Sequence, residues 1–530
     1  MDRTRNGFKI VLTADRTLMS EYNGGIFLGF SACVPKGVIP DKLYFSLFCP
    51  SVPVNKDGSA KYAPCGTRKM EAELLKNGYT PNEVIVAHPD HLDKVIGPNT
   101  KALCITENDP LGMGPATSTF RNLFGGQSYM EIKFKEILNN PAVQKYKPKI
   151  IVGGAGAWQL EEEPVRKTLG VDTVVIGEGE KAIDNLFTTT ALEDDWPGVI
   201  NTPVVEEPKI PLIVKGTIDG IVEISRGCGR GCAFCVPTLQ QYRCRSIESI
   251  LKEVDVNLKA GRRPLLHAED VLRYKAKGFE VNEPAVRELF ETVYHLPGVK
   301  AVAISHFALS SAVSAPNLIK DLSRILEVKS GSLWMSGQCG IETASPKLIK
   351  SMMAGKAKPF TPDEWPEVVE KGFRLLNENN WVPVATLIIG LPGEEEEDTQ
   401  LTIDLVERLR ERKSVIVPLF MVCEGGLKGK AESFTMDKMN RVQSELFLKC
   451  WQHNLDWSDT LIKEYFVESI TRSYGIRLIF KYGAGEANKL IKRCKDEYDY
   501  DMNTMINEAK AGKISIGPLP IRLLSKVLKH

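Results

Sequence analysis

The chain has 530 residues, a formal net charge of +1 at pH 7 and a hydrophobic share of 43%. This length allows two or three domains with sizeable cores, and a charge near zero gives no general attraction to nucleic acid or to an anionic membrane. The 12 cysteines are too few for a disulfide scaffold, no apolar run of about 18 residues predicts a membrane span, and the first residues lack the apolar core of a signal peptide, so we expect a cytoplasmic protein.

Short apolar segments alternate with amphipathic ones in the first 203 residues. The pattern predicts helices over 71–77 and 129–138, and strands over 8–13, 84–87, 103–106, 149–154 and 173–180. Strands that are apolar throughout and separated by helices are typical of a parallel, doubly wound sheet. Ligands of such sheets bind beyond the carboxyl ends of the strands. We therefore expect an α/β, Rossmann-like domain over residues 1–205, with a ligand site at that edge.

Glycines gather at the predicted strand ends, where the absence of a Cβ lets a bulky ligand approach the backbone. They are Gly112, Gly114, Gly153, Gly154, Gly156, Gly177 and Gly179. A dinucleotide fingerprint fits poorly, because residues 154–158 are not G-x-G-x-x-G and follow a late strand. The double glycine and the Gly177-Glu178-Gly179-Glu180 end instead resemble cobalamin-binding domains fused to radical S-adenosylmethionine (SAM) domains. That resemblance implies that Gly153, Gly154 and Gly177 lie against the corrin and its nucleotide tail; ordinary turns are the alternative.

A long loop rich in glycine, proline and threonine follows the third predicted strand, over residues 109–120. We expect Asp109, Leu111 and Gly112 to lie near the same ligand, with a surface loop as the alternative. The loop after the first strand contains no D-x-H-x-x-G, and the nearest histidines, His88 and His91, follow the second strand. A histidine donating to cobalt is therefore not expected.

The second part of the chain, residues 221–424, consists of six predicted strand–helix units. The strands are 221–225, 264–268, 301–306, 333–338, 382–389 and 415–422, and the helices are 246–260, 285–295, 315–327, 361–379 and 395–412. Ser246 and Thr361 are expected helix N-caps. Six such units form an open, partial βα barrel whose strand ends converge on one mouth.

Three cysteines follow the first of these strands with C-x3-C-x2-C spacing: Cys228, Cys232 and Cys235. Three thiolates suit a [4Fe–4S] cluster, which takes four ligands, so that one iron stays open for a small chelating molecule. The alternative is zinc, which needs four protein ligands, and no second pair lies nearby. Cys244 is the one close extra thiol, beyond Pro237. The spacing resembles that of the radical SAM superfamily, so we expect a [4Fe–4S] cluster that binds SAM.

Polar residues at the barrel strand ends are the candidates for holding SAM. The resemblance implies that the second strand's end meets the methionyl ammonium and that the fourth meets the ribose and carboxylate, while the fifth resembles the adenine-side motif. Arginine suits planar pairing with a carboxylate. Each residue also has a purely structural alternative. The candidates are Arg243, Glu269, Asp270, Ser305, Gln338, Glu342 and Gly390.

The last part of the chain is predicted to be mainly helical, with helices over 439–457, 461–474 and 486–494. Its aromatic residues recur at helix-face spacing, which is more often core than substrate cleft. A cap over the barrel mouth is the functional alternative. The expected domains are 1–205, 206–425 and 426–530.

Residues 7–425 together resemble the cobalamin-dependent radical SAM methyltransferases. The resemblance implies a [4Fe–4S] cluster, SAM and cobalamin as cofactors, methyl transfer to an unactivated carbon, and a reductant such as ferredoxin. Residues 12–20 and 109–112 resemble a methanogen-associated archaeal group that modifies methyl-coenzyme M reductase, especially the glutamine C-methyltransferase. The implied substrate is thus the α-carbon of a glutamine in that enzyme's alpha subunit. A small-molecule or lipid methyltransferase, a cyclase and a non-enzymatic iron–sulfur or corrinoid protein are the alternatives.

Overall fold

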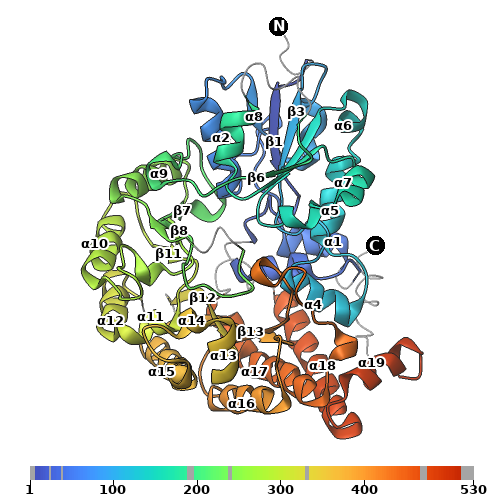
Figure 1. Ribbon diagram of the computed structural model, residues 1–530, viewed down its shortest axis with the longest axis vertical. Helices are drawn as coiled ribbons and strands as arrows, with labels where there is room; N and C mark the ends of the chain where they lie inside the picture. The colour runs from blue at the N-terminus through green and yellow to red at the C-terminus, as the bar shows by residue number, and fades with distance from the viewer. Residues whose placement is uncertain are drawn as a thin grey trace.

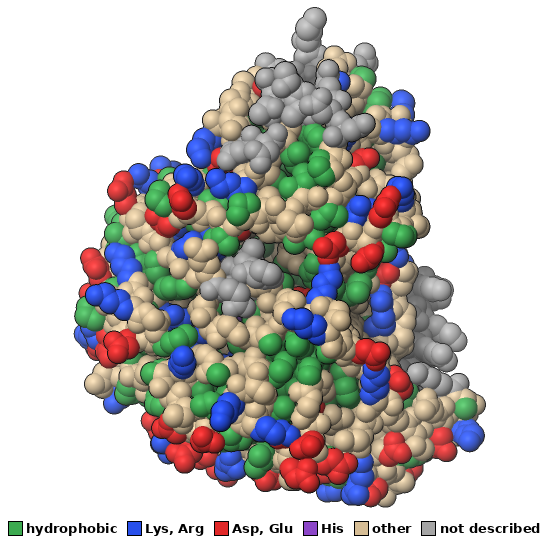
Figure 2. Space-filling view, viewed as in Figure 1, with side chains coloured by type: hydrophobic (Ala, Val, Ile, Leu, Met, Phe, Trp, Pro, Cys, Tyr) green, Lys and Arg blue, Asp and Glu red, His purple; other side chains and the backbone are tan. Residues whose placement is uncertain are grey.

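The computed structural model describes residues 6–22, 26–37, 40–187, 196–236, 241–328, 334–465 and 474–514. Figure 1 shows a parallel sheet at the top, an arc of barrel strands and helices down the left and along the bottom, and long C-terminal helices at the lower right. Positive and negative side chains are intermixed on the face in Figure 2, in keeping with the net charge of +1. Among the described helices, none is both long and apolar enough to cross a membrane.

The N-terminal sheet has six parallel strands in the order β2-β1-β3-β4-β5-β6. The order reverses beside β1, so that the topological switch point lies between β1 and β3. Five of the strands were predicted. The sixth, β6, was missed because it is short and only partly buried. The strands are β1 Ile10–Ala14, β2 Val84–Val86, β3 Ala102–Thr106, β4 Lys149–Gly153, β5 Thr173–Ile176 and β6 Val199–Asn201.

Helices cover both faces of this sheet because alternate strand residues point to opposite sides. Leu12 packs with Leu74 and Ile183 in one core cluster, whereas Val11 packs with Phe134 in another. The predicted helix 129–138 is confirmed with those bounds, but the one predicted at 71–77 begins earlier, at Cys65. The helices are α1 Asp41–Leu43, α2 Cys65–Lys76, α3 Leu92–Val95, α5 Tyr129–Leu138, α6 Pro141–Tyr146, α7 Glu163–Leu169 and α8 Glu180–Leu186.

Part of the predicted loop 109–120 is instead a helix, α4 (Pro115–Phe124). Pro115 occupies the first helical turn, where a missing N–H costs nothing, so this proline starts a helix rather than a loop. The helix reaches the barrel. Thr119 Oγ1 accepts a 2.8 Å hydrogen bond from the backbone N–H of Phe420, and Asn122 Oδ1 accepts a 3.0 Å bond from that of Met436.

The barrel has the six predicted parallel strands. They form two three-stranded sheets, in the orders β11-β10-β7 and β12-β13-β14, which meet at a parallel bridge between His306 and Gln338. The first residue of the predicted strand 333–338 lies outside the described residues. The strands are β7 Ile221–Glu223, β10 Leu265–His267, β11 Ala303–Ile304, β12 Met335–Glu342, β13 Trp381–Ile389 and β14 Val415–Phe420.

The five predicted barrel helices are present, and both predicted caps are confirmed. Ser246 Oγ accepts from the Ser249 N–H at 3.2 Å, and Thr361 forms a capping box with Glu364. Three short helices that were not predicted fill the connections. The helices are α9 Ile247–Lys259, α10 Glu283–Tyr294, α11 Leu309–Ser314, α12 Pro316–Ile325, α13 Pro346–Met352, α14 Ala354–Ala357, α15 Trp365–Glu378 and α16 Glu396–Arg408.

The C-terminal part is helical as predicted, with α17 Arg441–Tyr465, α18 Tyr474–Tyr498 and α19 Met502–Lys510. Helix α17 packs against β14 and α16, and Asn454 hydrogen-bonds both backbone groups of Ile416 on β14. Cys450 and Cys494 belong to the same hydrophobic core as the barrel. Trp451 packs against this core, as the core interpretation predicts, whereas Tyr482 is exposed. The predicted helix 461–474 falls partly outside the described residues.

A chain of buried ion pairs joins the N-terminal sheet to the barrel, and we call it the seam network. Lys69 on α2 pairs with Glu253 on α9 and donates to the carbonyl of Pro211 at 2.8 Å. Arg226 lies 2.7 Å from Glu223 and 2.9 Å from both Glu178 and Glu180, which follow β5. Arg243 completes the network with a 2.6 Å bond to Glu178. Arg226 and Arg243 face each other on a two-stranded ribbon, β8 (Ser225–Arg226) and β9 (Arg243–Cys244).

Two carboxylates of the seam network, Glu223 and Glu178, stay charged at neutral pH despite their burial. Burial alone would raise the pKa of Glu223, but the positive charge of Arg226 lowers it to about 2. Burial likewise opposes ionisation of Glu178, yet hydrogen bonds from Arg243, Val205 and Arg226 hold the pKa of Glu178 below its usual value. Both carboxylates are therefore ionised throughout the ordinary pH range.

We predict that Lys69→Met lowers the free energy of unfolding by about 3–5 kcal/mol, because it removes the close cation of the buried Glu253 carboxylate and leaves it the more distant Arg245, 3.8 Å away, and the N–H of Ile213 at 3.3 Å. Urea denaturation of the cofactor-free protein measures this, with the buried Trp365 and Trp381 as fluorescent reporters. Lys252→Met is the matched control, since Lys252 pairs with Glu248 on the exposed face of α9 and its loss should leave the midpoint unchanged. Equal effects of the two variants would contradict the prediction.

Candidate functional site

The three cysteines lie on a loop that follows β8 directly, as predicted. Gly227, Gly229 and Gly231 alternate with other residues along this loop and have φ angles of +78°, +69° and +73°. The residues between them stay outside the left-handed region. Backbone that alternates in handedness turns successive N–H groups toward one concave side, a conformation found at many phosphate and iron–sulfur sites.

Arg230 anchors this loop from within. Its guanidinium donates to the carbonyls of Gly355, Lys356 and Lys358 at 2.9–3.2 Å, and to Asp270 Oδ2 at 3.0 Å. The backbone carbonyl of Arg230 also lies so close to Gly355 that a Cβ there would stand 1.9 Å from it. Segments far along the chain thus fix the loop's shape.

The loop is held from two further sides. Arg273 donates to the carbonyl of Cys228 at 2.8 Å, and the N–H of Ala233 donates to the carbonyl of Met352 at 2.9 Å. A Cβ on Gly425, whose φ is +53°, would meet the carbonyl of Cys235 at 2.1 Å. Only glycine fits at such a position.

The thiols and the cations around them fit an iron–sulfur cluster. A hydrogen bond from Cys235 lowers the pKa of Cys232 to about 7, and the same contact raises the pKa of Cys235. Arg230, Arg273 and Lys356 add positive charge that favours thiolates. In the described part of the chain, no three potential ligands converge on one point as a single metal ion requires. A [4Fe–4S] cube instead spreads its ligands over separate irons.

Cys244, the possible fourth zinc ligand, is engaged elsewhere. Its sulfur lies 2.9 Å from the hydroxyl of Tyr242 and accepts from the N–H of Lys275 at 3.0 Å. The donor set on the loop therefore remains the three cysteines, which favours the cluster over a closed zinc site.

Glu342, a predicted SAM residue, is linked to the cysteine loop through its ion pair with Lys356. It follows a β-bulge, has a φ of +61° and is buried. One carboxylate oxygen accepts from Lys356 Nζ at 2.8 Å and the other from Thr386 Oγ1 at 3.1 Å. Although burial opposes it, the charge of Glu342 raises the pKa of Lys356, which also interacts electrostatically with Cys232. Glu342 and Lys356 thus present opposite charges beside the loop.

Three other predicted SAM residues are used inside the barrel wall. Asp270 accepts from Arg230 at 3.0 Å and from Ser311 at 2.7 Å, so it braces the cysteine loop, and its contact with SAM stays a prediction. Ser305 Oγ donates to the carbonyl of Ala268 at 3.1 Å. Gln338 Oε1 lies 3.1 Å from His306 Nε2, at the bridge between the two half-barrels. Their partners lie far along the chain, on the cysteine loop, on α11 and at neighbouring strand ends, which sequence spacing does not reveal.

The two remaining barrel candidates, Glu269 and Gly390, differ in how open they are to a ligand. Glu269 is half-buried and, within the described residues, forms no ion pair, so it stays available to a ligand. Gly390 has a φ of +84°, and its N–H donates to Glu394 at 2.6 Å. The ring of Phe434 covers it, since a Cβ there would stand 2.1 Å from that ring.

Arg243, predicted to pair with the carboxylate of SAM, bonds Glu178 of the N-terminal part, and its place at SAM stays a prediction. Both guanidinium Nη atoms bond Glu178, at 2.6 and 3.1 Å, and one also donates to the carbonyl of Val205. The structure therefore brings together Arg243, expected at SAM, and Glu178, expected at the corrin. The ion pair across the seam engages both Nη atoms of Arg243, in keeping with its bracing alternative, while the buried Nε has no hydrogen-bond partner among the described residues.

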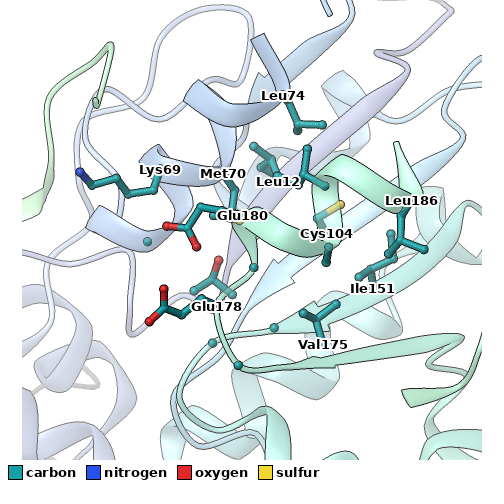
Figure 3. A pocket seen from close by; sticks show the side chains of 18 of the residues that line it. Leu12, Lys69, Met70, Leu74, Cys104, Ile151, Val175, Glu178, Glu180 and Leu186 are labelled. Carbon is teal, nitrogen blue, oxygen red and sulfur yellow. The ribbon is translucent and has the colours of Figure 1, made fainter. Parts of the chain in front are cut away.

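A cavity of about 280 Å³ lies at the carboxyl edge of the N-terminal sheet, under α2 and α8. Four predicted cobalamin residues line it: Gly153, Gly154, Gly177 and Glu178. Figure 3 shows Lys69, Glu178 and Glu180 at one side and apolar side chains at the other. The apolar lining residues are Leu12, Met70, Leu74, Cys104, Ile151, Val175, Ala182, Ile183, Leu186 and Phe187.

Asp109, Leu111 and Gly112 form an internally bonded turn and do not line this cavity. Asp109 Oδ1 accepts from the N–H groups of Met113 and Gly114 and from Gln159 Nε2, at 2.6–2.9 Å. The N–H of Leu111 donates to Gln159 Oε1 at 2.8 Å. Gly112, with a φ of +67°, leaves room for Arg121. Their nearness to a corrin remains a prediction.

Two buried carboxyls at the switch point were not singled out from the sequence. Asp15 follows β1 and Glu107 follows β3, and both are fully buried. Burial raises the pKa of Asp15 to about 6, and burial also holds the pKa of Glu107 well above its ordinary value. Their positions directly after predicted strands were the available signal. His88 uses both ring nitrogens within the chain, with Ser51 Oγ at 2.8 Å and the N–H of Asp90 at 3.2 Å.

Comparison with known proteins gives similarities in sequence and in fold. No family model matches the chain. A tRNA-2-methylthio-N(6)-dimethylallyladenosine synthase of Orientia tsutsugamushi is 24% identical over 275 residues, which are 50% of this chain and 58% of that enzyme. The chain thus spans little more than half the length of this relative.

Two solved structures share the fold. The radical S-adenosylmethionine methyltransferase TsrM from Kitasatospora setae, with tryptophan substrate and aza-SAM bound, matches with a TM-score of 0.51 and 13% identity, over 79% of this chain and 75% of its own. The cobalamin-dependent S-adenosylmethionine radical enzyme OxsB, with aqua-cobalamin and S-adenosylmethionine bound, matches with a TM-score of 0.50 and 12% identity, over 98% and 83%. These likenesses confirm the predicted fold, a Rossmann-like sheet followed by a partial βα barrel.

We predict that Gly355→Ala displaces the cysteine loop, because the new Cβ would collide with the carbonyl of Arg230, and overpacking of this kind costs about 1–3 kcal/mol. Iron and sulfide analysis after anaerobic reconstitution should show a clear loss relative to the unaltered chain. Gly483→Ala on α18 is the control, since no atom lies within 4 Å of its added Cβ. Full iron content in Gly355→Ala would show that Gly355 does not set the loop.

Proposed function

We propose that this chain is a cobalamin-dependent radical SAM C-methyltransferase with a [4Fe–4S] cluster, SAM and cobalamin as cofactors. The observation that carries the proposal is a direct connection between the cysteine loop and the cavity of the parallel sheet. Arg226 immediately precedes the cysteine loop and bonds Glu178 and Glu180, which border the glycine-lined cavity of the parallel sheet. The two sites that the two cofactors require are thus built onto one another.

The donor chemistry at each site supports this assignment. Cys228, Cys232 and Cys235 would hold the cluster, and Glu342, Lys356 and Glu269 offer charges of both signs to the amine and carboxylate of SAM. The apolar cavity, with Gly153, Gly154 and Gly177 at its mouth, would take the nucleotide tail of cobalamin. The fold similarity to cobalamin-bound OxsB extends over 98% of the chain, which supports both sites together.

The cofactors supply the difficult chemistry and the chain supplies geometry. When bound, the cluster and SAM provide hydrogen abstraction from an unactivated carbon, and cobalamin carries the methyl group that SAM donates. Arg230 and Arg273 fix the cysteine loop, while the seam network fixes that loop relative to the sheet edge. The substrate carbon has to lie between the two sites, so their fixed separation is the chain's main contribution to the reaction.

For the substrate we propose the α-carbon of a glutamine in the alpha subunit of methyl-coenzyme M reductase. This rests on the resemblance of residues 12–20 and 109–112 to the archaeal glutamine C-methyltransferase. The alternative is a small molecule or lipid, methylated or cyclised. Methylthio transfer is a second candidate reaction, favoured by the named activity of the Orientia tsutsugamushi relative.

A crossed pair of variants tests the two cofactor sites separately. Cys232→Ala should abolish release of 5′-deoxyadenosine and leave corrinoid binding intact. Ala182→Trp should fill the cavity, weaken corrinoid binding about tenfold or more, and leave iron content unchanged. Corrinoid titration by absorbance and chromatographic assay of 5′-deoxyadenosine provide the measurements. The cluster assignment is wrong if Cys232→Ala retains its 5′-deoxyadenosine release, and the cavity assignment is wrong if Ala182→Trp binds corrinoid normally.

Mass spectrometry tests the reaction and the substrate. A glutamine-containing peptide of the methyl-coenzyme M reductase alpha subunit, incubated with methyl-labelled SAM, should gain one labelled methyl group on the glutamine α-carbon. The same peptide with alanine in place of the glutamine is the control and should stay unmodified. A gain of one methylthio group would instead favour the second candidate, and an unmodified glutamine peptide beside normal 5′-deoxyadenosine release would contradict the proposed substrate.

A further inference from the structure

Three cations surround one aromatic ring next to the cysteine loop. Phe279 lies on the connection between β10 and α10, with Arg273 at 5.0 Å, Lys358 at 5.2 Å and Arg230 at 5.5 Å from its ring centroid. Such cation–π contacts are attractive one by one, but three like charges around a ring repel one another. The arrangement therefore favours a nearby anion.

The chain itself supplies little negative charge at this place. Lys275, Lys277 and Lys358 are exposed, and among the described residues none of them forms an ion pair. Arg273 is buried and, within the same residues, also lacks an acidic partner. Asp270 is taken up by Arg230.

An acid, Glu280, lies beside these lysines, and its backbone bridges to Lys277. This carboxylate alone does not balance three exposed lysines and the buried Arg273. The whole chain has a net charge of only +1, so this positive charge is a local feature. We call the group Lys275, Lys277, Phe279 and Lys358 the Phe279 surface.

The Phe279 surface is connected to the first cysteine by direct contacts. The guanidinium that lies over Phe279, that of Arg273, donates to the carbonyl of Cys228 at 2.8 Å. The N–H of Lys275 donates to Cys244, and the ring of Tyr242 lies 4.8 Å from the same guanidinium. A partner seated on this surface would therefore lie one residue away from a cluster ligand.

We infer that the Phe279 surface is the docking site for a small acidic one-electron carrier protein. The inference rests on the proposed function, because it presumes a cluster on the three cysteines that must be reduced from outside. One electron passes from the carrier's centre to the cluster, so the carrier is oxidised by one equivalent as the cluster is reduced, and no atom is transferred. Charge complementarity favours an acidic partner and speeds its encounter.

The test measures binding first. The probe is an acidic bacterial two-cluster ferredoxin, with its Kd for the reconstituted protein determined at low and at high salt. The triple variant Lys275→Glu, Lys277→Glu and Lys358→Glu should weaken binding about tenfold or more at low salt, with the difference shrinking as salt screens the charges. The matched control reverses three exposed lysines on other faces that also lack ion pairs among the described residues: Lys300→Glu, Lys320→Glu and Lys492→Glu.

A second measurement separates docking from the proposed function itself. With dithionite, a small-molecule reductant, the triple variant should form 5′-deoxyadenosine at the normal rate, whereas with reduced ferredoxin its rate should fall in step with the Kd. Lys277→Glu alone should give a smaller change in the same direction. Equal Kd values for the two triple variants would overturn the inference, as would loss of the dithionite-driven rate with unchanged ferredoxin binding. Absence of cluster absorbance in the unaltered protein would instead contradict the proposed function.

Discussion

The buried seam network is the interaction on which the arrangement of the two sites depends. Glu178 receives both Arg226 and Arg243, and Arg226 adjoins the first glycine of the cysteine loop. Ions removed from water gain little net stability from pairing, but a pair that loses one member leaves a costly bare charge. The network therefore permits one relative position of sheet and barrel and penalises the others. The network matters for geometry. Its side chains border the cavity at the sheet edge and also hold the start of the cysteine loop.

A second attachment acts at the opposite end of the barrel. Helix α4 leaves the N-terminal sheet and bonds the end of β14, while the seam network holds β7 and α9. The strands β7 and β14 are the two edges of the open barrel, so the N-terminal part spans the gap between them. An exposed strand edge invites unwanted pairing. Here the same contacts that cover the end of β14 also orient α4 and the loop that precedes it.

Local sequence patterns predicted the elements that depend on interactions within a few residues. The C-x3-C-x2-C loop, the barrel strands, helix 129–138 and the caps at Ser246 and Thr361 all follow from periodicity, spacing and capping chemistry within a few residues. What these patterns left out lies where a distant partner decides. Arg243 pairs with Glu178, and Asp270 with Arg230, and neither partner is visible in the surrounding sequence. The edge strand β6 was missed because it is short and only partly buried, and helix α4 was missed because Pro115 and the glycines before it are typical of a loop.

The enclosure of the cysteine loop by Gly355 and Gly425 bears on biosynthesis. The carbonyls that hold Arg230 and the backbone that closes over Cys235 both belong to segments translated long after the cysteines themselves. While the ribosome is still making the barrel's second half, the three thiols have no fixed relation to one another. The proposed cluster site is thus complete only in a nearly finished polypeptide, not in a nascent one.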